Sequence, residues 1–102
     1  MNKAVYIIAQ IEVKNRDFKA YFEEYALKLK DMLPKYQGEA LAGTTKAEVI
    51  EGERFGNWTV ILKFPSKELA YACINSAEYA PIAAKRINEL QTGGNVLMVP
   101  GQ

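Results

Sequence analysis

Hydrophobic and polar side chains alternate with a period of two in two segments of the chain. In residues 4–13 the odd-numbered positions are all apolar, whereas the even-numbered positions mix apolar and polar side chains. Residues 58–64 show the same alternation, here with the even-numbered positions apolar. A period of two is typical of a strand with one face on a core. Both segments are therefore predicted to be strands with one fully apolar face and one mixed face.

A long amphipathic helix is predicted between these strands, because apolar residues recur there at spacings of three and four. Asn15 can cap its first turn, and Gly38 suits the left-handed residue that often closes a helix. The helix should have about five turns, and Pro34 should loosen or end it. Its apolar stripe consists of Phe18, Tyr21, Phe22, Tyr25, Leu29, Met32, Leu33 and Tyr36.

A second helical region is predicted after the strand at residues 58–64. Ser66 follows Pro65 and is a good N-cap for a helix that runs to Ile74. Residues 75–76 interrupt this helix, and apolar residues spaced for a helix then continue to Leu90. This region is therefore predicted to be two short helices.

The remaining segments have weaker patterns. Residues 39–50 are predicted to be extended, with a bulge or bend near Gly43, and residues 51–57 read as a hairpin loop. Residues 92–95 contain two adjacent glycines and are predicted to be a turn. Residues 96–99 are predicted to form a short last strand.

The order of these elements is β-α-β-β-α-β, which predicts a single α+β domain over residues 1–102 with a ferredoxin-like fold. In that layout the first and third strands lie in the middle of a four-stranded antiparallel sheet, and both helices cover one face. The other face then carries Tyr6, Ile8 and Ile61, whose apolar groups need a cover. We expect a second copy of the chain to provide it, which gives a homodimer through the open sheet face.

The charge of the chain excludes several kinds of partner. Thirteen basic and twelve acidic residues give a net charge of +1, and the basic residues are spread along the chain. Binding to nucleic acid or to an anionic membrane surface needs a concentrated cationic face, so neither is expected. A single cysteine, Cys73, cannot form an internal disulfide, and a cytoplasmic location is expected.

The chain contains no histidine. This excludes Ser-His-Asp and Cys-His catalysis, histidine-ligated haem, and the usual zinc and non-haem iron sites. We therefore expect neither a metal site nor a cofactor. The glutamates around residue 51 are interpreted as a solvated acidic turn.

Two groups of residues are candidates for binding a ligand. A guanidinium pairs with carboxylates and an indole stacks on flat rings, so Arg54 and Trp58 could hold an anionic or aromatic molecule. Ser76, Tyr79 and Arg86 belong to the densest polar group of the chain, where a helix N-terminus would favour an anion. The alternative is structural: Trp58 in the core, Arg54 in solvent, Ser76 as a cap and Tyr79 as a packing residue.

Tyrosines and the cysteine on apolar helical stripes are interpreted as core residues. Tyr21, Tyr25 and Tyr36 recur on one stripe, where a buried phenol could donate a proton or a hydrogen bond. Cys73 has no neighbour in the sequence that would lower its pKa, so an inert core thiol is expected.

Several short segments resemble a known family in their order and spacing. They are Tyr6-Ile7-Ile8-Ala9, Tyr36-Gln37-Gly38, Glu51-Gly52, Phe64-Pro65-Ser66, Ala70, Ser76-Ala77-Glu78-Tyr79 and Arg86. On these segments the sequence is similar to a small bacterial family, a domain of unknown function within the dimeric α+β barrel superfamily. The resemblance implies a homodimer whose two sheets face each other, and it implies no particular activity.

Three functions stay open from the sequence. The first is a small-molecule site between the helices and the sheet of each protomer. The second is a non-enzymatic module that binds a metabolite or only mediates oligomerisation. The third, a cofactor-free oxygenase or isomerase, follows only from analogy with the superfamily. No residue is assigned a catalytic role.

Overall fold

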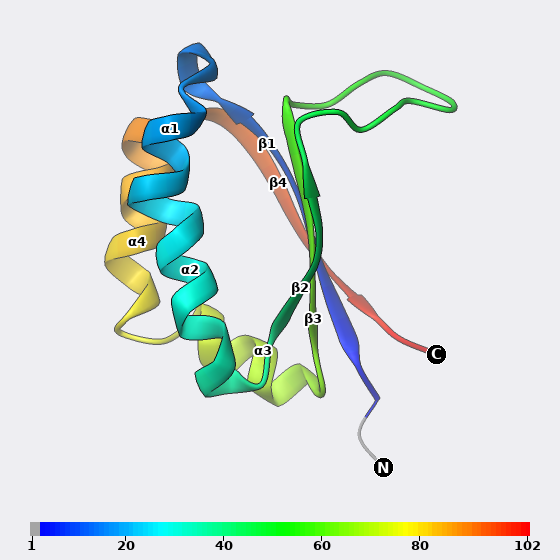
Figure 1. Ribbon diagram of the computed structural model, residues 1–102. Coiled ribbons are helices and arrows are strands. Elements are labelled where there is room, and N and C mark those ends of the chain that lie inside the picture. Colours follow the sequence, from blue (N-terminus) through cyan, green and yellow to red (C-terminus); the bar gives the residue numbers. More distant parts are fainter. Residues whose placement is uncertain (1–2) are drawn as a thin grey trace.

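The computed structural model describes residues 3–102 as a sheet with one layer of helices (Figure 1). The strands are β1 (Val5–Val13), β2 (Glu39–Thr44), β3 (Trp58–Phe64) and β4 (Gln91–Pro100). The first helical segment comprises α1 (Phe18–Tyr21), a π-helical turn (Phe22–Ala26), α2 (Leu27–Met32) and a 3₁₀ turn (Leu33–Tyr36). The second comprises α3 (Lys67–Ile74), α4 (Tyr79–Lys85) and another π-helical turn (Arg86–Leu90).

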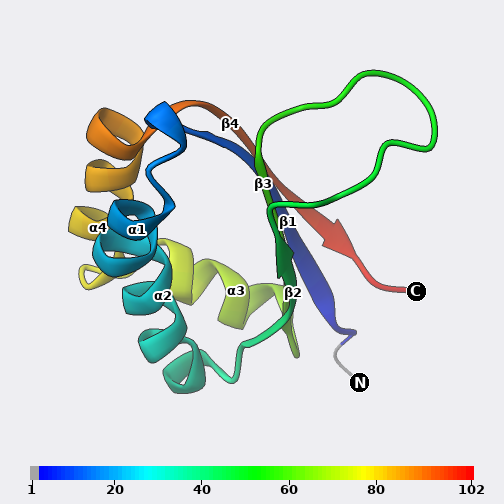
Figure 2. The same cartoon turned by 45° about the horizontal axis from the view of Figure 1, so that its top comes forward.

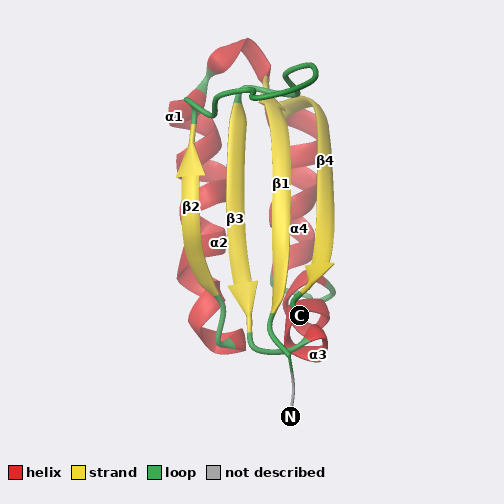
Figure 3. Cartoon of the chain, turned by 90° about the vertical axis from the view of Figure 1, so that its right-hand side faces the viewer, coloured by secondary structure: helices red, strands yellow, loops and turns green. Residues whose placement is uncertain are grey.

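The sheet is antiparallel and has the strand order β2-β3-β1-β4. The predicted α+β, ferredoxin-like fold is confirmed: β1 and β3 are the central strands, and the helices cover one face (Figure 1). Figure 3 views the sheet from its other face, with the helices behind it. No helix in residues 3–102 is both long and apolar enough to cross a membrane.

The two faces of β1 differ in burial as the sequence pattern predicts. Its odd-numbered residues are buried against the helices, and most of its even-numbered residues are half-buried on the open face. Near one end of the sheet, Val5 and Ile7 pack in a cluster with Leu33 and Phe64. Near the other end, Ile11 packs in a second cluster with tyrosines of the first helical segment.

The first helical segment begins two residues later than predicted. Asp17, not Asn15, is its N-cap, because the Asp17 side chain accepts a hydrogen bond from the Ala20 N–H at 3.1 Å. Asn15 and Arg16 both have φ of 55° in a tight turn that redirects the chain out of β1. Asparagine tolerates this left-handed conformation, so Asn15 serves the turn and leaves the cap to Asp17.

The end of this segment also differs from the prediction. Gln37, with φ of 58°, is the left-handed residue, and the Gly38 N–H donates to the Leu33 carbonyl at 2.9 Å. Gly38 is required for a different reason, since a Cβ there would lie 2.7 Å from the Phe64 ring. The glycine therefore permits close packing on β3.

The predicted turn at residues 92–95 is wrong. These residues lie inside β4, and Gly93 and Gly94 pair with Glu12 and Ile11 of β1. A Cβ on Gly94 would lie 2.7 Å from Cδ1 of Ile11, so the glycine leaves room for that core side chain. The bulge expected near Gly43 occurs slightly earlier, where the β2–β3 register shifts between Ala40 and Ala42.

The connection between β2 and β3 is longer than the predicted hairpin loop. It spans residues 45–57 and projects from the sheet on the side away from the helices (Figures 1 and 2). Gly56 has φ of 76°, and a Cβ there would lie 2.6 Å from the Ile11 carbonyl oxygen. The loop is thus pressed against the backbone of β1 just before β3 begins.

Asn57 fixes this junction with its buried side chain. Its Oδ1 accepts a hydrogen bond from the Val13 N–H at 2.7 Å, and its Nδ2 donates to the Val13 carbonyl at 3.2 Å. Nδ2 also donates to the Glu12 carboxylate at 3.1 Å. One side chain therefore satisfies both backbone groups of the residue that ends β1.

Replacing this side chain should destabilise the fold. We predict that Asn57→Ala lowers the free energy of unfolding by about 1–3 kcal/mol, because it leaves buried backbone groups of Val13 without partners. Urea denaturation followed by circular dichroism measures the change. Asn88→Ala, at an exposed position, is the matched control and should have little effect. Equal losses in the two variants would contradict this role of Asn57.

Candidate functional site

A cavity of about 660 Å³ lies between the helices and the sheet. Its size is within the range of small-molecule sites in proteins. Small residues on facing elements leave the space open, namely Ala9, Ala26, Ala40, Ala42, Gly43, Ala80 and Ala83. The rest of the wall is mainly aliphatic or aromatic, with Ile7 and Ile11 on β1 and Trp58 and Leu62 on β3. The cavity is therefore an apolar space built from every strand and both helical segments.

The cavity has solvent-exposed lining residues in two places. Ile87 after α4 and Val96 on β4 are exposed, and so are Leu27 and Lys30 on α2 and Leu41 on β2. Leu27 is 52% exposed and Leu41 is 49% exposed, although both are large apolar residues. A ligand that entered here would pass between apolar side chains and one exposed lysine.

One polar cluster interrupts the apolar wall. The hydroxyls of Tyr25 and Tyr79 are 2.6 Å apart and share a hydrogen bond. The guanidinium carbon of Arg86 lies 5.0 Å from the centre of the Tyr25 ring, and Nη1 of Arg86 donates to Oε1 of Gln91. Tyr21 packs on Tyr25 with ring centres 5.3 Å apart. The first helical segment, α4 and its π-helical extension thus bring three phenols and one guanidinium together.

The charge of Arg86 has no counter-ion among the described residues. Arg86 is only 7% exposed, and its Nε is buried without a hydrogen-bond partner. The ion pairs in residues 3–102 lie elsewhere: Lys35 with Glu78, and Lys85 with Glu24 and Glu89. Burial lowers the pKa of Arg86, but its tyrosine neighbours raise it by more, so the side chain stays a cation. Burying a charge without a partner lowers the stability of the folded protein.

Two phenols of the cluster, Tyr21 and Tyr25, are neutral at ordinary pH. Burial raises the pKa of Tyr21 and Tyr25 well above the usual value, and the opposing effect of Arg86 is smaller. The nearby Tyr79 raises the pKa of Tyr25 further. These hydroxyls therefore act as hydrogen-bond donors and acceptors, not as phenolate bases.

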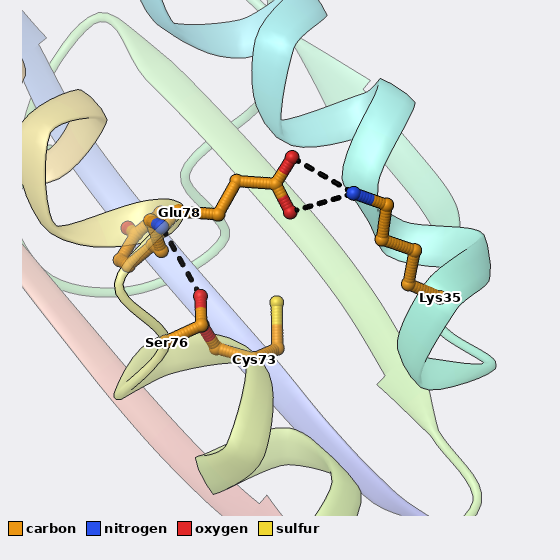
Figure 4. A network of polar contacts seen from close by, with 5 residues as sticks. Lys35, Cys73, Ser76 and Glu78 are labelled. Carbon is orange, nitrogen blue, oxygen red and sulfur yellow. Dashed lines mark hydrogen bonds and ion pairs between the residues drawn. The ribbon is translucent and has the colours of Figure 1, made fainter.

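Two of the residues proposed from the sequence meet in this cluster. Tyr79 and Arg86 both line the cavity. Ser76 instead starts the helix that carries them, since its hydroxyl accepts from the Tyr79 N–H at 3.1 Å and donates to the Cys73 carbonyl at 2.8 Å. Glu78 points to the surface and pairs with Lys35 at 2.9 Å (Figure 4).

Arg54 and Trp58 do not share a site. Trp58 lines the cavity and packs edge-on against Phe22, with ring centres 5.0 Å apart. Arg54 lies in the loop at residues 45–57, where its guanidinium donates to the Ala47 carbonyl. It borders a separate polar depression of about 300 Å³ on the loop.

Tyr25 and Tyr21 are the site residues that sequence reasoning assigned to the core. The available signal was the recurrence of tyrosine on an otherwise aliphatic stripe. Cys73 also borders the cavity, and burial raises the pKa of its thiol, in keeping with the inert role expected for it. In residues 3–102, carboxylates and the cysteine form no group of three or more that could hold a metal.

The raised pKa of Tyr25 predicts a loss of stability at high pH. A phenol titrates near pH 10 when the chain is unfolded, so above about pH 10 the unfolded state loses a proton that the folded state keeps. The contribution of the neutral Tyr25 phenol to the free energy of unfolding is therefore complete below about pH 10 and is lost above it. We expect Tyr25→Phe to flatten the fall of the melting temperature between about pH 9 and pH 11.

The matched control for this experiment is Tyr71→Phe, which removes a phenol from an exposed position. Its melting temperature should follow that of the wild type over the same pH range. If Tyr25→Phe and the wild type lose stability in parallel, the phenol of Tyr25 is not protected from ionisation in the folded protein.

The fold and cavity define a ferredoxin-like α+β protein with a largely apolar cavity under its helices. Residues 4–102 match the family described as Domain of unknown function (DUF1330), and the chain belongs to this family. The family resemblance predicted from the sequence is thereby confirmed. No curated protein is significantly similar to the chain in sequence.

Solved structures with little sequence similarity share the fold. A protein of unknown function from Rhodopseudomonas palustris has a TM-score of 0.79 at 12% identity, over 100% of this chain and 85% of that chain. A protein from Caulobacter crescentus, provisionally described as an antibiotic biosynthesis monooxygenase, has a TM-score of 0.69 at 13% identity, over 99% and 92% of the two chains. A ferredoxin-like protein of unknown function from Bacteroides fragilis, described as dimeric, has a TM-score of 0.63 at 10% identity, over 96% of each chain.

Proposed function

We propose that each protomer binds a small, largely apolar organic molecule in the cavity between the helices and the sheet, and that the protein is a homodimer. One observation carries the ligand site: a cavity of about 660 Å³ has apolar walls and a single cluster of converging polar groups. Apolar walls with a few placed polar groups are the usual composition of such sites. The cavity walls supply the affinity, and the cluster orients the ligand.

Binding is better supported than catalysis by the side chains in the cavity. No carboxylate or histidine is among its described lining residues, and burial keeps Tyr21 and Tyr25 protonated. An oxygenase or isomerase that abstracts a proton needs a base within hydrogen-bond reach of the substrate. We therefore propose binding as the primary function, and turnover of a bound compound would favour the enzymatic alternative.

The open face of the sheet supports the homodimer. Ile8 of β1 pairs with Ile61 of β3 on one side and with Leu97 of β4 on the other. Two residues away on the same face, Tyr6 pairs with Val99. Leu97 is 59% exposed and Val99 is 38% exposed in the single chain. An apolar patch over three strands is typical of an interface, and the second copy would cover it.

The long loop at residues 45–57 projects on the same side as this patch (Figure 1). It carries exposed apolar side chains, and Ile50 is 96% exposed. In a face-to-face dimer the loop would extend beside the partner's sheet, where Ile50 and Val49 would be buried. We propose the cytoplasm as the compartment, since the free thiol of Cys73 suits reducing conditions.

The ligand site is tested by filling the cavity. Ala83 borders it on α4, and its neighbour Ala84 is exposed and does not. We expect aromatic and short acyl compounds to raise the melting temperature of the wild type and of Ala84→Phe. Ala83→Phe should lose most of this effect, because its ring occupies the space. Thermal shift identifies ligands, and NMR titration confirms their place; no response to any compound would contradict the proposal.

The homodimer is tested by light scattering coupled to size-exclusion chromatography. We expect the wild type to have twice the chain mass of 11.4 kDa, and Ile8→Asp to have the single mass, because a carboxylate cannot be buried in an apolar interface. Tyr71→Asp places the same charge on the exposed side of α3 and should stay dimeric. A monomeric wild type would refute the dimer but leave the ligand site intact.

A further inference from the structure

We infer that the ligand carries a single carboxylate, which binds the guanidinium of Arg86 and a hydroxyl of the Tyr25–Tyr79 pair. This inference rests on the proposed function, since it assumes that the cavity binds a small molecule. It adds the chemical class of that molecule: a monoanionic carboxylic acid with an aromatic or branched apolar body.

The first argument is the charge balance of the cavity. Arg86 lines the cavity and is only 7% exposed. It has no carboxylate partner in the described part of the chain. Its polar and aromatic contacts are uncharged groups, namely the Gln91 amide, the Tyr79 hydroxyl and the ring of Tyr25. An anionic ligand would supply the missing counter-charge in an apolar space, where an ion pair with hydrogen bonds is strongest.

The second argument is a count of hydrogen-bond donors. Nε of Arg86 is buried and has no partner. In the bond between Tyr25 and Tyr79 one hydroxyl donates and the other accepts, so the accepting hydroxyl keeps a proton for a further bond. Of the five N–H groups of its guanidinium, Arg86 uses one toward Gln91. The cluster therefore offers further N–H groups and one free O–H beside a positive charge, which suit the two oxygens and the single charge of a carboxylate.

The third argument concerns the rest of the ligand. Beyond the cluster the wall is apolar, and Trp58 and Phe22 present an edge-to-face aromatic pair at the side of the cavity. Arg86 is the only buried cation of the lining, since Lys30 is exposed. A phosphate dianion would bring a second charge that nothing deep in the cavity balances. The geometry thus favours a monoanion with an apolar body.

The experiment compares three probes of one shape: phenylacetate, phenylacetamide and phenyl phosphate. With the wild type we expect phenylacetate to bind at least about tenfold more tightly than the amide, because charge-assisted bonds are lost in the amide. Phenyl phosphate should bind more weakly than phenylacetate. Isothermal titration calorimetry measures the dissociation constants, and NMR checks that the probes bind in the cavity.

Variants of Arg86 separate ligand binding from a structural role. Arg86→Met removes the charge and should abolish the preference for phenylacetate over the amide. Because the charge is buried and unpaired, we expect the melting temperature of unliganded Arg86→Met not to fall. Tyr79→Phe is a milder second variant and should weaken phenylacetate binding severalfold. Lys85→Met, on the exposed side of the same helix, is the matched control and should bind as the wild type does.

Each outcome supports the carboxylate inference or overturns it. Equal binding of the acid and the amide by the wild type would overturn it, although the proposed ligand site would stand. Tighter binding of phenyl phosphate would also overturn it. If Arg86→Met melts at a lower temperature and both it and Tyr79→Phe keep the preference, Arg86 is structural. If neither these probes nor the wider panel binds, the proposed function fails as well.

Discussion

The structure depends on the strict alternation of side chains along β1. This strand lies in the middle of the sheet, and its odd-numbered residues form part of both core clusters while its even-numbered residues face the open side. A shift of one residue would exchange the two faces, so the register must be fixed. Asn57 and Gly56 fix it, since one satisfies the backbone of Val13 and the other allows the loop to lie on Ile11.

The candidate site follows from how the second helical segment is started and placed. Ser76 ends the turn after α3 and caps the next helix, which points Tyr79 and Arg86 toward the sheet. Tyr25 lies on the other helical segment and contacts both Tyr79 and Arg86. The cluster therefore exists only when the two helical segments are packed side by side. The unfavourable free energy of burying Arg86 is offset by the packing of the core around it.

Local periodicity predicted the fold well, and close tertiary contacts account for the errors. The strands at β1 and β3 and the cap at Ser66 depend on signals within a few residues. Gly38 was predicted to close a helix and Gly94 to lie in a turn, and both predictions are wrong. Each glycine instead makes room for a side chain distant in sequence, which the sequence alone does not show. Tyr79 and Arg86 were predicted as part of a polar group. Tyr25 was predicted to lie in the core, where it is buried, but its bond to Tyr79 could not be predicted because the two residues are 54 positions apart.

The two proposed properties lie on opposite sides of one strand. Ile7 borders the ligand cavity, and the adjacent Ile8 faces the open side with Leu97 and Ile61. Because consecutive side chains of a strand point in opposite directions, a substitution at Ile8 changes the open face without touching the cavity wall. Ligand binding and self-association can therefore be altered separately, although both depend on the position of β1. The sheet is the common support of both properties.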